Sequence, residues 1–200
     1  MSPYRYTAQA STSSASDTEA LGFALGCCLR LGDVVSLNGD LGAGKTVFTK
    51  GVARALGIEA PITSPTFTLA NQYQGSSMLH HLDVYRLAGP EEAYDLALDE
   101  LYESGVTIVE WGDIIAEELP PDAMRIDLRI ELEPVVPPGG GGPAQPVDDP
   151  NQAWEDLDSG RRIDLIGIGP RWENRAAELD SALAPWRNEG GPGSPGEASC

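Results

Sequence analysis

Lysine is nearly absent from this chain of 200 residues: it occurs only at Lys45 and Lys50, against eleven arginines. The formal net charge is −18, and Arg161 and Arg162 form the one adjacent basic pair. A protein that binds a polyanion by itself needs several clustered basic side chains to neutralise phosphates. Unaided nucleic-acid binding is therefore disfavoured, whereas the acidic balance suits general solubility or docking on a basic protein partner.

Cysteine and long apolar runs are also scarce. The cysteines are Cys27, Cys28 and Cys200, which form no C-x-x-C pair. Cys27 and Cys28 fall in an apolar helical stretch, where free cysteine packs as a small hydrophobe. No apolar run approaches 18 residues and no signal-peptide pattern is present, so we expect a cytoplasmic protein without membrane contact.

Aliphatic side chains are sparse in two segments, 134–159 and 187–200, which are rich in Pro, Gly, Asp and Ser. Such segments bury too little apolar surface to offset the entropy of ordering them. The remainder, residues 1–133 and 160–186, has the size of one domain. We expect a single domain that carries a flexible insertion at 134–159 and a disordered tail at 187–200.

A phosphate-binding loop is the most specific feature that the sequence contains. Residues 39–46, Gly-Asp-Leu-Gly-Ala-Gly-Lys-Thr, match the pattern G-x-x-x-x-G-K-[ST] in full. The apolar run 34–38 before the loop predicts a buried strand, and the spacing of Phe48 and Val52 predicts a helix that begins near Lys45. In this context the loop indicates a nucleotide-binding protein.

The chemistry of such a loop assigns a role to each of its parts. Backbone N–H groups surround phosphate oxygens, and the helix adds its N-terminal partial positive charge. Lys45 is expected to contact the β- and γ-phosphates, and the Thr46 hydroxyl to take one Mg²⁺ position. The residues expected to bind the nucleotide through this loop are Asp40, Leu41, Gly42, Ala43, Gly44, Lys45 and Thr46.

A magnesium site also needs a carboxylate at the end of a neighbouring strand. Glu110 directly follows the apolar run 106–109, which is typical of a central parallel strand, and is the favoured second ligand. Asp83 lies in the second strand of an expected hairpin. It could orient water, bind the metal through water, or pair with Arg86.

Other positions leave alternatives open. Pro65 holds the preceding residue extended, and Thr66 could sense the γ-phosphate through the metal or belong to a plain turn. Trp111 could pack in the core or form a wall beside the nucleotide. His80 and His81 have no metal-ligand spacing to a second cluster, so packing roles are favoured for both.

Strands alternate with helices along the chain, which predicts an α/β fold: a three-layer P-loop NTPase-type sheet, mostly parallel, with an antiparallel hairpin element. Ser16 and Glu19 have the spacing of a capping box at the start of the first helix. The expected helices are 17–30, 45–56, 91–103, 113–119 and 171–183. The expected strands are 34–38, 67–74, 78–85, 106–109, 124–132 and 163–168.

Four motifs, taken in order, resemble the TsaE family, formerly called YjeE. They are residues 39–46, 64–69 (Ser-Pro-Thr-Phe-Thr-Leu), 81–87 (His-Leu-Asp-Val-Tyr-Arg-Leu) and 108–111 (Ile-Val-Glu-Trp). The resemblance covers about residues 16–133 and resumes over about 160–175. It implies an ATPase that works with TsaD and TsaB, which transfer a threonylcarbamoyl group to N6 of adenosine 37 in tRNAs reading ANN codons. Contact with tRNA would be indirect, through that complex.

The resemblance also implies roles for particular residues. Lys45 would hold phosphates, Thr46 and Glu110 would hold Mg²⁺, and Asp83 would assist hydrolysis of ATP. Thr66 would lie in a switch-like loop.

Trp111 would lie beside the nucleotide. Thr18, Asp113 and Arg161 are weaker matches, for the adenosine pocket. The segment 134–158 is longer than the usual connection of the family, but a long surface insertion costs little free energy.

Three other functions share the phosphate loop. A GTPase is disfavoured because the common guanine-binding pattern N-K-x-D is absent and no lysine follows Lys50. A small-molecule kinase would need an acceptor pocket and an arginine-bearing lid, for which Arg125, Arg129, Arg161 and Arg162 are available. A nucleotide-dependent binding module with little turnover is the third alternative.

Overall fold

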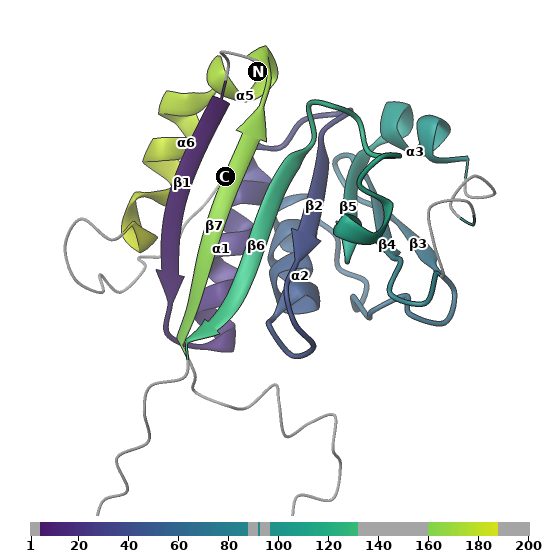
Figure 1. The fold of residues 1–200 in the computed structure, drawn as a ribbon, viewed down its shortest axis with the longest axis horizontal. Helices are drawn as coiled ribbons and strands as arrows, with labels where there is room; N and C mark the ends of the chain where they lie inside the picture. The colour runs from purple at the N-terminus through teal and green to yellow at the C-terminus, as the bar shows by residue number, and fades with distance from the viewer. Residues whose placement is uncertain (1–4, 88–91, 93–96, 132–159, 188–200) are drawn as a thin grey trace, which may run out of the picture.

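The computed structural model describes residues 5–87, 92, 97–131 and 160–187, which form a seven-stranded sheet with helices packed on it (Figure 1). The strands are β1 (Arg5–Thr12), β2 (Val34–Asn38), β3 (Ala70–Gln74), β4 (Met78–Asp83), β5 (Val106–Glu110), β6 (Met124–Glu131) and β7 (Gly160–Ile168). The helices are α1 (Ala15–Cys28), α2 (Lys45–Ala55), α3 (Leu98–Ser104), α5 (Pro170–Glu173) and α6 (Ala176–Leu183), with 3-10 turns η2 (Gly112–Ile115) and η3 (Ala184–Trp186).

The strand order is β1-β7-β6-β2-β5-β4-β3. β2 pairs in parallel with β5 and β6, and β4 pairs in parallel with β5. β3 and β4 form the expected antiparallel hairpin, so the predicted α/β sheet is confirmed. The sheet also has an antiparallel edge, β6-β7-β1, that we did not predict, because β1 was not recognised as a strand.

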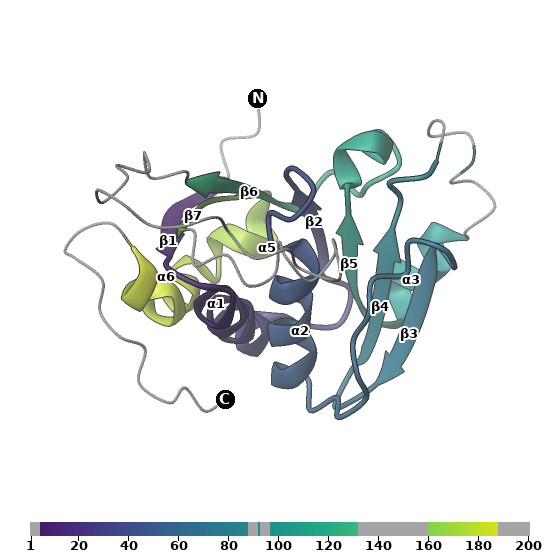
Figure 2. The same ribbon diagram turned by 90° about the horizontal axis from the view of Figure 1, so that it is seen from below.

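Helices cover both faces of the β2-β5-β4 part of the sheet, but only one face of the β1-β7-β6 part among the described residues (Figure 2). α1, α2 and α6 lie together on one face over the larger apolar core. α3 and η2 pack on the opposite face, where Leu98 and Ile115 join a smaller core with Leu82 and Val109. The three-layer arrangement is therefore found in the half of the sheet that carries the phosphate loop.

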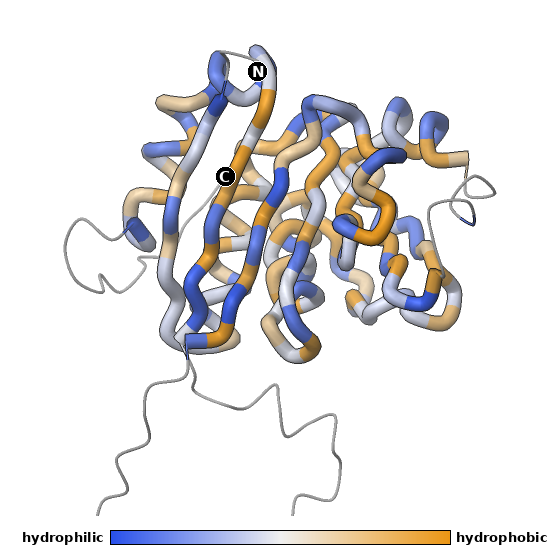
Figure 3. The backbone as a smooth tube through the Cα atoms, in the orientation of Figure 1, coloured by the Kyte–Doolittle hydropathy of each residue, from blue (hydrophilic) through white to orange (hydrophobic). Residues whose placement is uncertain are grey.

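Burial along each strand follows this layering. Every residue of β2 and β5 is buried, as in strands covered on both faces. β1 and β6 instead alternate between buried and exposed residues, which is typical of a sheet with one solvated face. In Figure 3, which is coloured by hydropathy, hydrophilic (blue) segments recur along β6 and β7.

The first helix begins earlier than the capping pattern predicted. Ser14 is its N-cap, and the Ser14 hydroxyl accepts a hydrogen bond from the Asp17 backbone N–H at 3.1 Å. Glu19, the predicted partner of Ser16, instead forms an ion pair with Arg54 of α2 at 3.0 Å. The capping-box prediction was therefore wrong, because Asp17 and not Glu19 closes the first turn.

The C-terminal helix predicted at 171–183 is divided into α5 and α6. The break falls at Arg175, whose guanidinium is buried and forms a paired contact with Asp33 at 2.8 and 2.9 Å. Arg175 also donates to the backbone carbonyl of Cys28 at 2.9 Å. This ion pair ties the C-terminal segment to the turn that precedes β2.

Other element boundaries differ from the predictions for local reasons. β3 begins at Ala70 because Thr68 and Leu69 donate backbone hydrogen bonds to Pro65 in a turn. The helix expected at 113–119 is a 3-10 turn that ends at Ile115. The helix expected at 91–103 is observed as α3, Leu98–Ser104, and 91 and 93–96 lie outside the described residues. The predicted insertion 134–159 and nearly all of the tail 187–200 lie outside them too.

No helix in the described part of the chain combines the length and the apolar character needed to cross a membrane.

Glycines allow α1 and α2 to approach closely. A Cβ atom added at Gly22 would overlap the backbone carbonyl of Phe48, and one at Gly51 would overlap the backbone carbonyl of Glu19. A Cβ at Gly26 would lie 2.6 Å from the Cβ of Ala55. Because the phosphate loop leads directly into α2, this close packing also fixes the position of the loop.

Replacing Gly51 with Ala should destabilise the protein although alanine is the better helix former. The gain in helix propensity is about 1 kcal/mol, whereas overpacking costs typically about 1–3 kcal/mol. Here the obstacle is backbone, so we expect a net loss of about 1–2 kcal/mol, measured by urea unfolding. Lys50→Ala, next to it on α2, is the control and should change the free energy of unfolding by less than about 0.5 kcal/mol. A stabilised Gly51→Ala variant would contradict the close helix packing.

Candidate functional site

The phosphate loop, residues 39–46, lies at the carboxyl edge of the parallel strands, between β2 and α2 (Figure 1). Gly44 is the N-cap of α2 and has a φ of 103°, in the left-handed region that favours glycine. Gly39 has a φ of 137°, and a Cβ there would also overlap the backbone carbonyl of Leu128. The glycines therefore meet steric demands of the loop itself.

Lys45 turns back over the loop. Its Nζ donates to the carbonyl oxygens of Gly39 and Asp40, at 2.7 and 2.9 Å, and lies 3.6 Å from the ring centroid of Trp111. Burial lowers the pKa of the Lys45 ammonium, and the nearby carboxylates of Glu110 and Asp83 act in the opposite direction. A buried cation is thus held between loop carbonyls, an aromatic face and two acids.

Glu110 is the last residue of β5 and is almost completely buried. One carboxylate oxygen, Oε2, accepts a hydrogen bond from Thr46 Oγ1 at 3.1 Å. The other, Oε1, lies 2.7 Å from Nε2 of His81. The structure therefore brings together Thr46 and Glu110, the two predicted metal ligands, which are 64 residues apart.

Asp83, at the end of β4, organises the segment that contains Thr66. Its Oδ2 accepts hydrogen bonds from the hydroxyls of Ser64 at 2.6 Å and Thr66 at 2.5 Å. Its Oδ1 accepts from the backbone N–H of Tyr85 at 3.1 Å. No ion pair joins Asp83 to Arg86 among the described residues; the Arg86 guanidinium stacks 4.2 Å from the ring centroid of Phe67.

Trp111 occupies a strained backbone position directly after β5. Its φ of 62° is in the left-handed region, where a bulky residue is unusual. Its backbone N–H donates to Leu37 at 2.8 Å, and its ring lies 4.8 Å from the ring of Tyr85. In this backbone conformation the Trp111 ring contacts both the Lys45 ammonium and the Tyr85 ring.

These groups surround a cavity of about 440 Å³. The predicted site residues that line it are Leu41, Gly42, Gly44, Lys45, Thr46, Thr66, Asp83, Glu110, Trp111 and Arg161. Arg86, for which the sequence suggested only a pairing with Asp83, also lines the cavity. The lining residues to which the sequence had assigned no role are Ala15, Val47, Ser64, Phe67 and Tyr85. Most of these flank predicted residues within the same short motifs, which is the signal by which they could have been found.

Four other predicted residues do not line the cavity. Thr18 is fully buried, and its hydroxyl donates to the Ser14 carbonyl at 3.0 Å and contacts the Thr12 hydroxyl at 2.8 Å. Asp113 is exposed, and its backbone N–H donates to Asn38. Of the remaining two, Asp40 is exposed and Ala43 is buried.

Arg161, at the start of β7, reaches the loop from the other half of the sheet. It is 2 % exposed, and burial lowers the pKa of its guanidinium. A Cβ placed on Gly44 would lie 3.5 Å from Nε of Arg161 and 3.5 Å from the methyl group of Thr18. The buried Arg161 side chain, on β7, therefore lies beside the first turn of α2.

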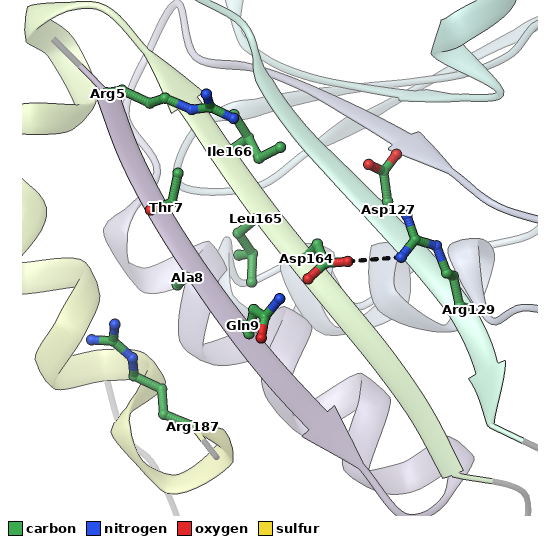
Figure 4. A pocket seen from close by; sticks show the side chains of 10 residues that line it. All are labelled: Arg5, Thr7, Ala8, Gln9, Asp127, Arg129, Asp164, Leu165, Ile166 and Arg187. Atoms are coloured by element: carbon green, nitrogen blue, oxygen red, sulfur yellow. Dashed lines mark hydrogen bonds and ion pairs between the residues drawn. The ribbon is translucent and has the colours of Figure 1, made fainter. Parts of the chain in front are cut away.

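A larger hollow, of about 600 Å³, lies over β1, β7 and β6 (Figure 4). Its lining residues are Arg5, Thr7, Ala8, Gln9, Asp127, Arg129, Asp164, Leu165, Ile166 and Arg187. Arg129 and Asp164 neutralise each other there through an ion pair at 3.1 Å. The hollow has no glycine loop and no helix N-terminus, so the cavity at the phosphate loop is the better candidate site despite its smaller volume.

The sequence matches a family model over residues 12–134, more than half of the chain. The model is described as "Threonylcarbamoyl adenosine biosynthesis protein TsaE". Similar proteins carry the name tRNA threonylcarbamoyladenosine biosynthesis protein TsaE. One from Treponema pallidum is 49% identical over 118 residues, which are 58% of this chain and 87% of that protein. One from Streptomyces coelicolor is 36% identical over 156 residues, or 76% of this chain and 91% of that protein.

The fold is similar to the crystal structure of Bacillus subtilis YdiB, with a TM-score of 0.67 and 30% sequence identity. The match covers 88% of this chain and 96% of YdiB. The family match and the fold match are both consistent with a phosphate loop that has acidic residues beside it. This chain belongs to the TsaE family of tRNA threonylcarbamoyladenosine biosynthesis and has a P-loop NTPase fold.

Proposed function

We propose that this chain is a magnesium-dependent ATPase that supports threonylcarbamoylation of adenosine 37 in tRNAs reading ANN codons, together with TsaD and TsaB. The observation that carries the proposal is the convergence of Lys45, Thr46, Asp83 and Glu110 on one cavity at the phosphate loop. Membership of the TsaE family supplies the tRNA-modification context.

The loop and Lys45 bind the phosphates in this proposal. The Lys45 ammonium already contacts two loop carbonyls, those of Gly39 and Asp40, so a small rotation of its flexible stem exchanges them for phosphate oxygens. Hydrogen bonds between an ammonium and a phosphate are stronger than those to a neutral carbonyl. A compact ammonium also fits between phosphates better than a guanidinium fork does.

Thr46 and Glu110 have the chemistry of magnesium ligands. Both offer oxygen atoms, and Thr46 Oγ1 lies 3.1 Å from Glu110 Oε2. The described residues contain no cluster of three or more His, Cys, Asp or Glu side chains that could hold a metal ion. Mg²⁺ is commonly bound by one or two protein groups together with substrate phosphates and water, so Thr46 and Glu110 suit it. When bound, Mg²⁺ would neutralise the charge that develops on the phosphate oxygens during hydrolysis.

Asp83 is the group that would orient the attacking water. It lies at the strand end beside Glu110, and its carboxylate already accepts hydrogen bonds from Ser64 and Thr66. A nucleotide that drew the Thr66 hydroxyl away would release part of this contact. Segment 64–69 would then respond to the state of the γ-phosphate, as a switch does.

The arrangement favours an ATPase over a small-molecule kinase. Of the four late arginines that a kinase lid could use, only Arg161 lines the cavity. Arg125 pairs with Asp127, Arg129 pairs with Asp164, and Arg162 donates to Gln9, all three along the open sheet face. The acidic composition further supports an indirect contact with tRNA, through a protein complex.

ATP hydrolysis with and without a TsaD–TsaB complex tests the proposal. We expect slow phosphate release by the chain alone and a faster rate with the partners. Lys45→Ala should lower the rate about 100-fold, because it removes a cation from the transferring phosphate. Lys50→Ala, the other lysine of the same helix, should leave the rate unchanged. Phosphorylation of a small molecule at a rate indifferent to TsaD–TsaB would instead establish a kinase.

Glu110→Gln should separate metal binding from nucleotide binding. The amide keeps the shape of the side chain but removes the charge that attracts Mg²⁺. We expect the affinity for a non-hydrolysable ATP analogue to fall about tenfold in saturating Mg²⁺ and to stay unchanged in EDTA, as measured by calorimetry. Equal affinities of Glu110→Gln and wild type in Mg²⁺ would remove Glu110 from the metal site.

Asp83→Asn should impair hydrolysis more than binding. Loss of a group that orients or deprotonates water typically costs about 10²–10⁴-fold in rate. We expect phosphate release in the presence of TsaD–TsaB to fall within that range while the affinity for ATP changes less than about threefold. Asp99→Asn, an exposed change on α3, is the matched control. A hydrolysis rate like that of wild type would exclude Asp83 from the chemical step.

A further inference from the structure

His81 is a buried polar side chain with a single hydrogen-bonding contact among the described residues. It lies on β4, is completely buried, and places Nε2 at 2.7 Å from Oε1 of Glu110. Glu110 is itself only 3 % exposed. Burial of a carboxylate is costly unless hydrogen bonds compensate for lost water, and His81 supplies one of them.

A hydrogen bond between His81 and the Glu110 carboxylate requires an N–H at Nε2 of His81. An ionised carboxylate can only accept hydrogen bonds, so Nε2 is the donor to Glu110. Nδ1 has no hydrogen-bond partner in the described part of the chain. The Nε2–H group of His81 therefore points at Oε1 of Glu110.

The neighbouring histidine shows that this contact comes from strand geometry. Side chains on a strand alternate between the two faces, so His81 and Asp83 share a face and His80 points to the other. His80 Nε2 contacts the Ser104 hydroxyl of α3 at 2.9 Å. In the parallel register, Asp83 lies opposite Glu110 and His81 opposite Ile108, which places the imidazole alongside the glutamate side chain.

We propose that His81 is a positioning residue that holds the Glu110 carboxylate for the metal. Its N–H fixes Oε1, which leaves Oε2 directed at the Thr46 hydroxyl, the other expected ligand. Glutamate has three rotatable side-chain bonds, so an anchor on one oxygen limits the orientations of the other. The proposal rests on the proposed magnesium role of Glu110. Loss of such an outer partner typically lowers metal affinity about 10–100-fold.

The test compares the affinity for a non-hydrolysable ATP analogue in saturating Mg²⁺ with that in EDTA; the ratio is the Mg²⁺ enhancement. His81→Leu removes the donor and should lower the enhancement about tenfold or more, with the affinity in EDTA unchanged. His81→Gln can place an amide N–H near the position of Nε2 and should restore most of it. His81→Asn places its amide too far from Glu110 and should behave like His81→Leu.

Two controls separate positioning from structure. His80→Leu removes the adjacent buried histidine and should leave the enhancement unchanged. Thermal unfolding identifies variants that do not fold. If His81→Leu does not fold, the proposal is tested by comparing the Mg²⁺ enhancement of His81→Gln with that of His81→Asn. In the double variant His81→Leu with Glu110→Gln, the two losses should not add, because both act on one carboxylate.

The outcomes distinguish this inference from the proposed function. If Glu110→Gln lowers the enhancement but His81→Leu and His81→Asn do not, the positioning role is overturned and the metal assignment stands. If Glu110→Gln itself has no effect, the metal assignment fails and the positioning role falls with it. If His80→Leu lowers the enhancement as much as His81→Leu, the effect is structural and the proposal is overturned.

Discussion

The parallel pairing of β4 with β5 is the constraint on which the site depends. It sets Asp83 opposite Glu110 at the carboxyl edge of the sheet, where the phosphate loop leaves β2. Local sequence places each acid in or after a strand, but only the pairing of the two strands brings the acids side by side. Each carboxylate oxygen then has a donor. For Asp83 these are the hydroxyls of Ser64 and Thr66 and the backbone N–H of Tyr85, and for Glu110 they are Thr46 and His81.

The site concentrates buried charge, which folding alone does not favour. Lys45, Asp83, Glu110 and Arg161 are all at most 5 % exposed, and removing such groups from water costs free energy. The close glycine contacts hold α2 against α1, and the Asp33–Arg175 ion pair ties the C-terminal segment to the turn before β2. Trp111 adds local backbone strain at the same place, as is common at functional sites.

The sequence predicted the parts of the site that local pattern controls. The loop at 39–46 and Glu110 after an apolar run are local signals, and the hairpin follows from a short turn between two β-like runs. The contact of His81 with Glu110 and the arrival of Arg161 beside Gly44 depend on strand register across the sheet, which no local pattern specifies. β1 was missed because its alternating small and polar residues, Thr7 to Thr12, carry a weak strand signal until they pair with β7.

In the proposed function, nucleotide and metal bind together at this edge of the sheet. A crystal structure with Mn²⁺ in place of Mg²⁺ and a non-hydrolysable ATP analogue tests it most directly, since Mn²⁺ is located by its anomalous scattering. We expect one peak beside the phosphates, next to Thr46 and Glu110. A nucleotide bound elsewhere, such as the hollow over β1, β7 and β6, or a metal distant from both Thr46 and Glu110, would contradict it.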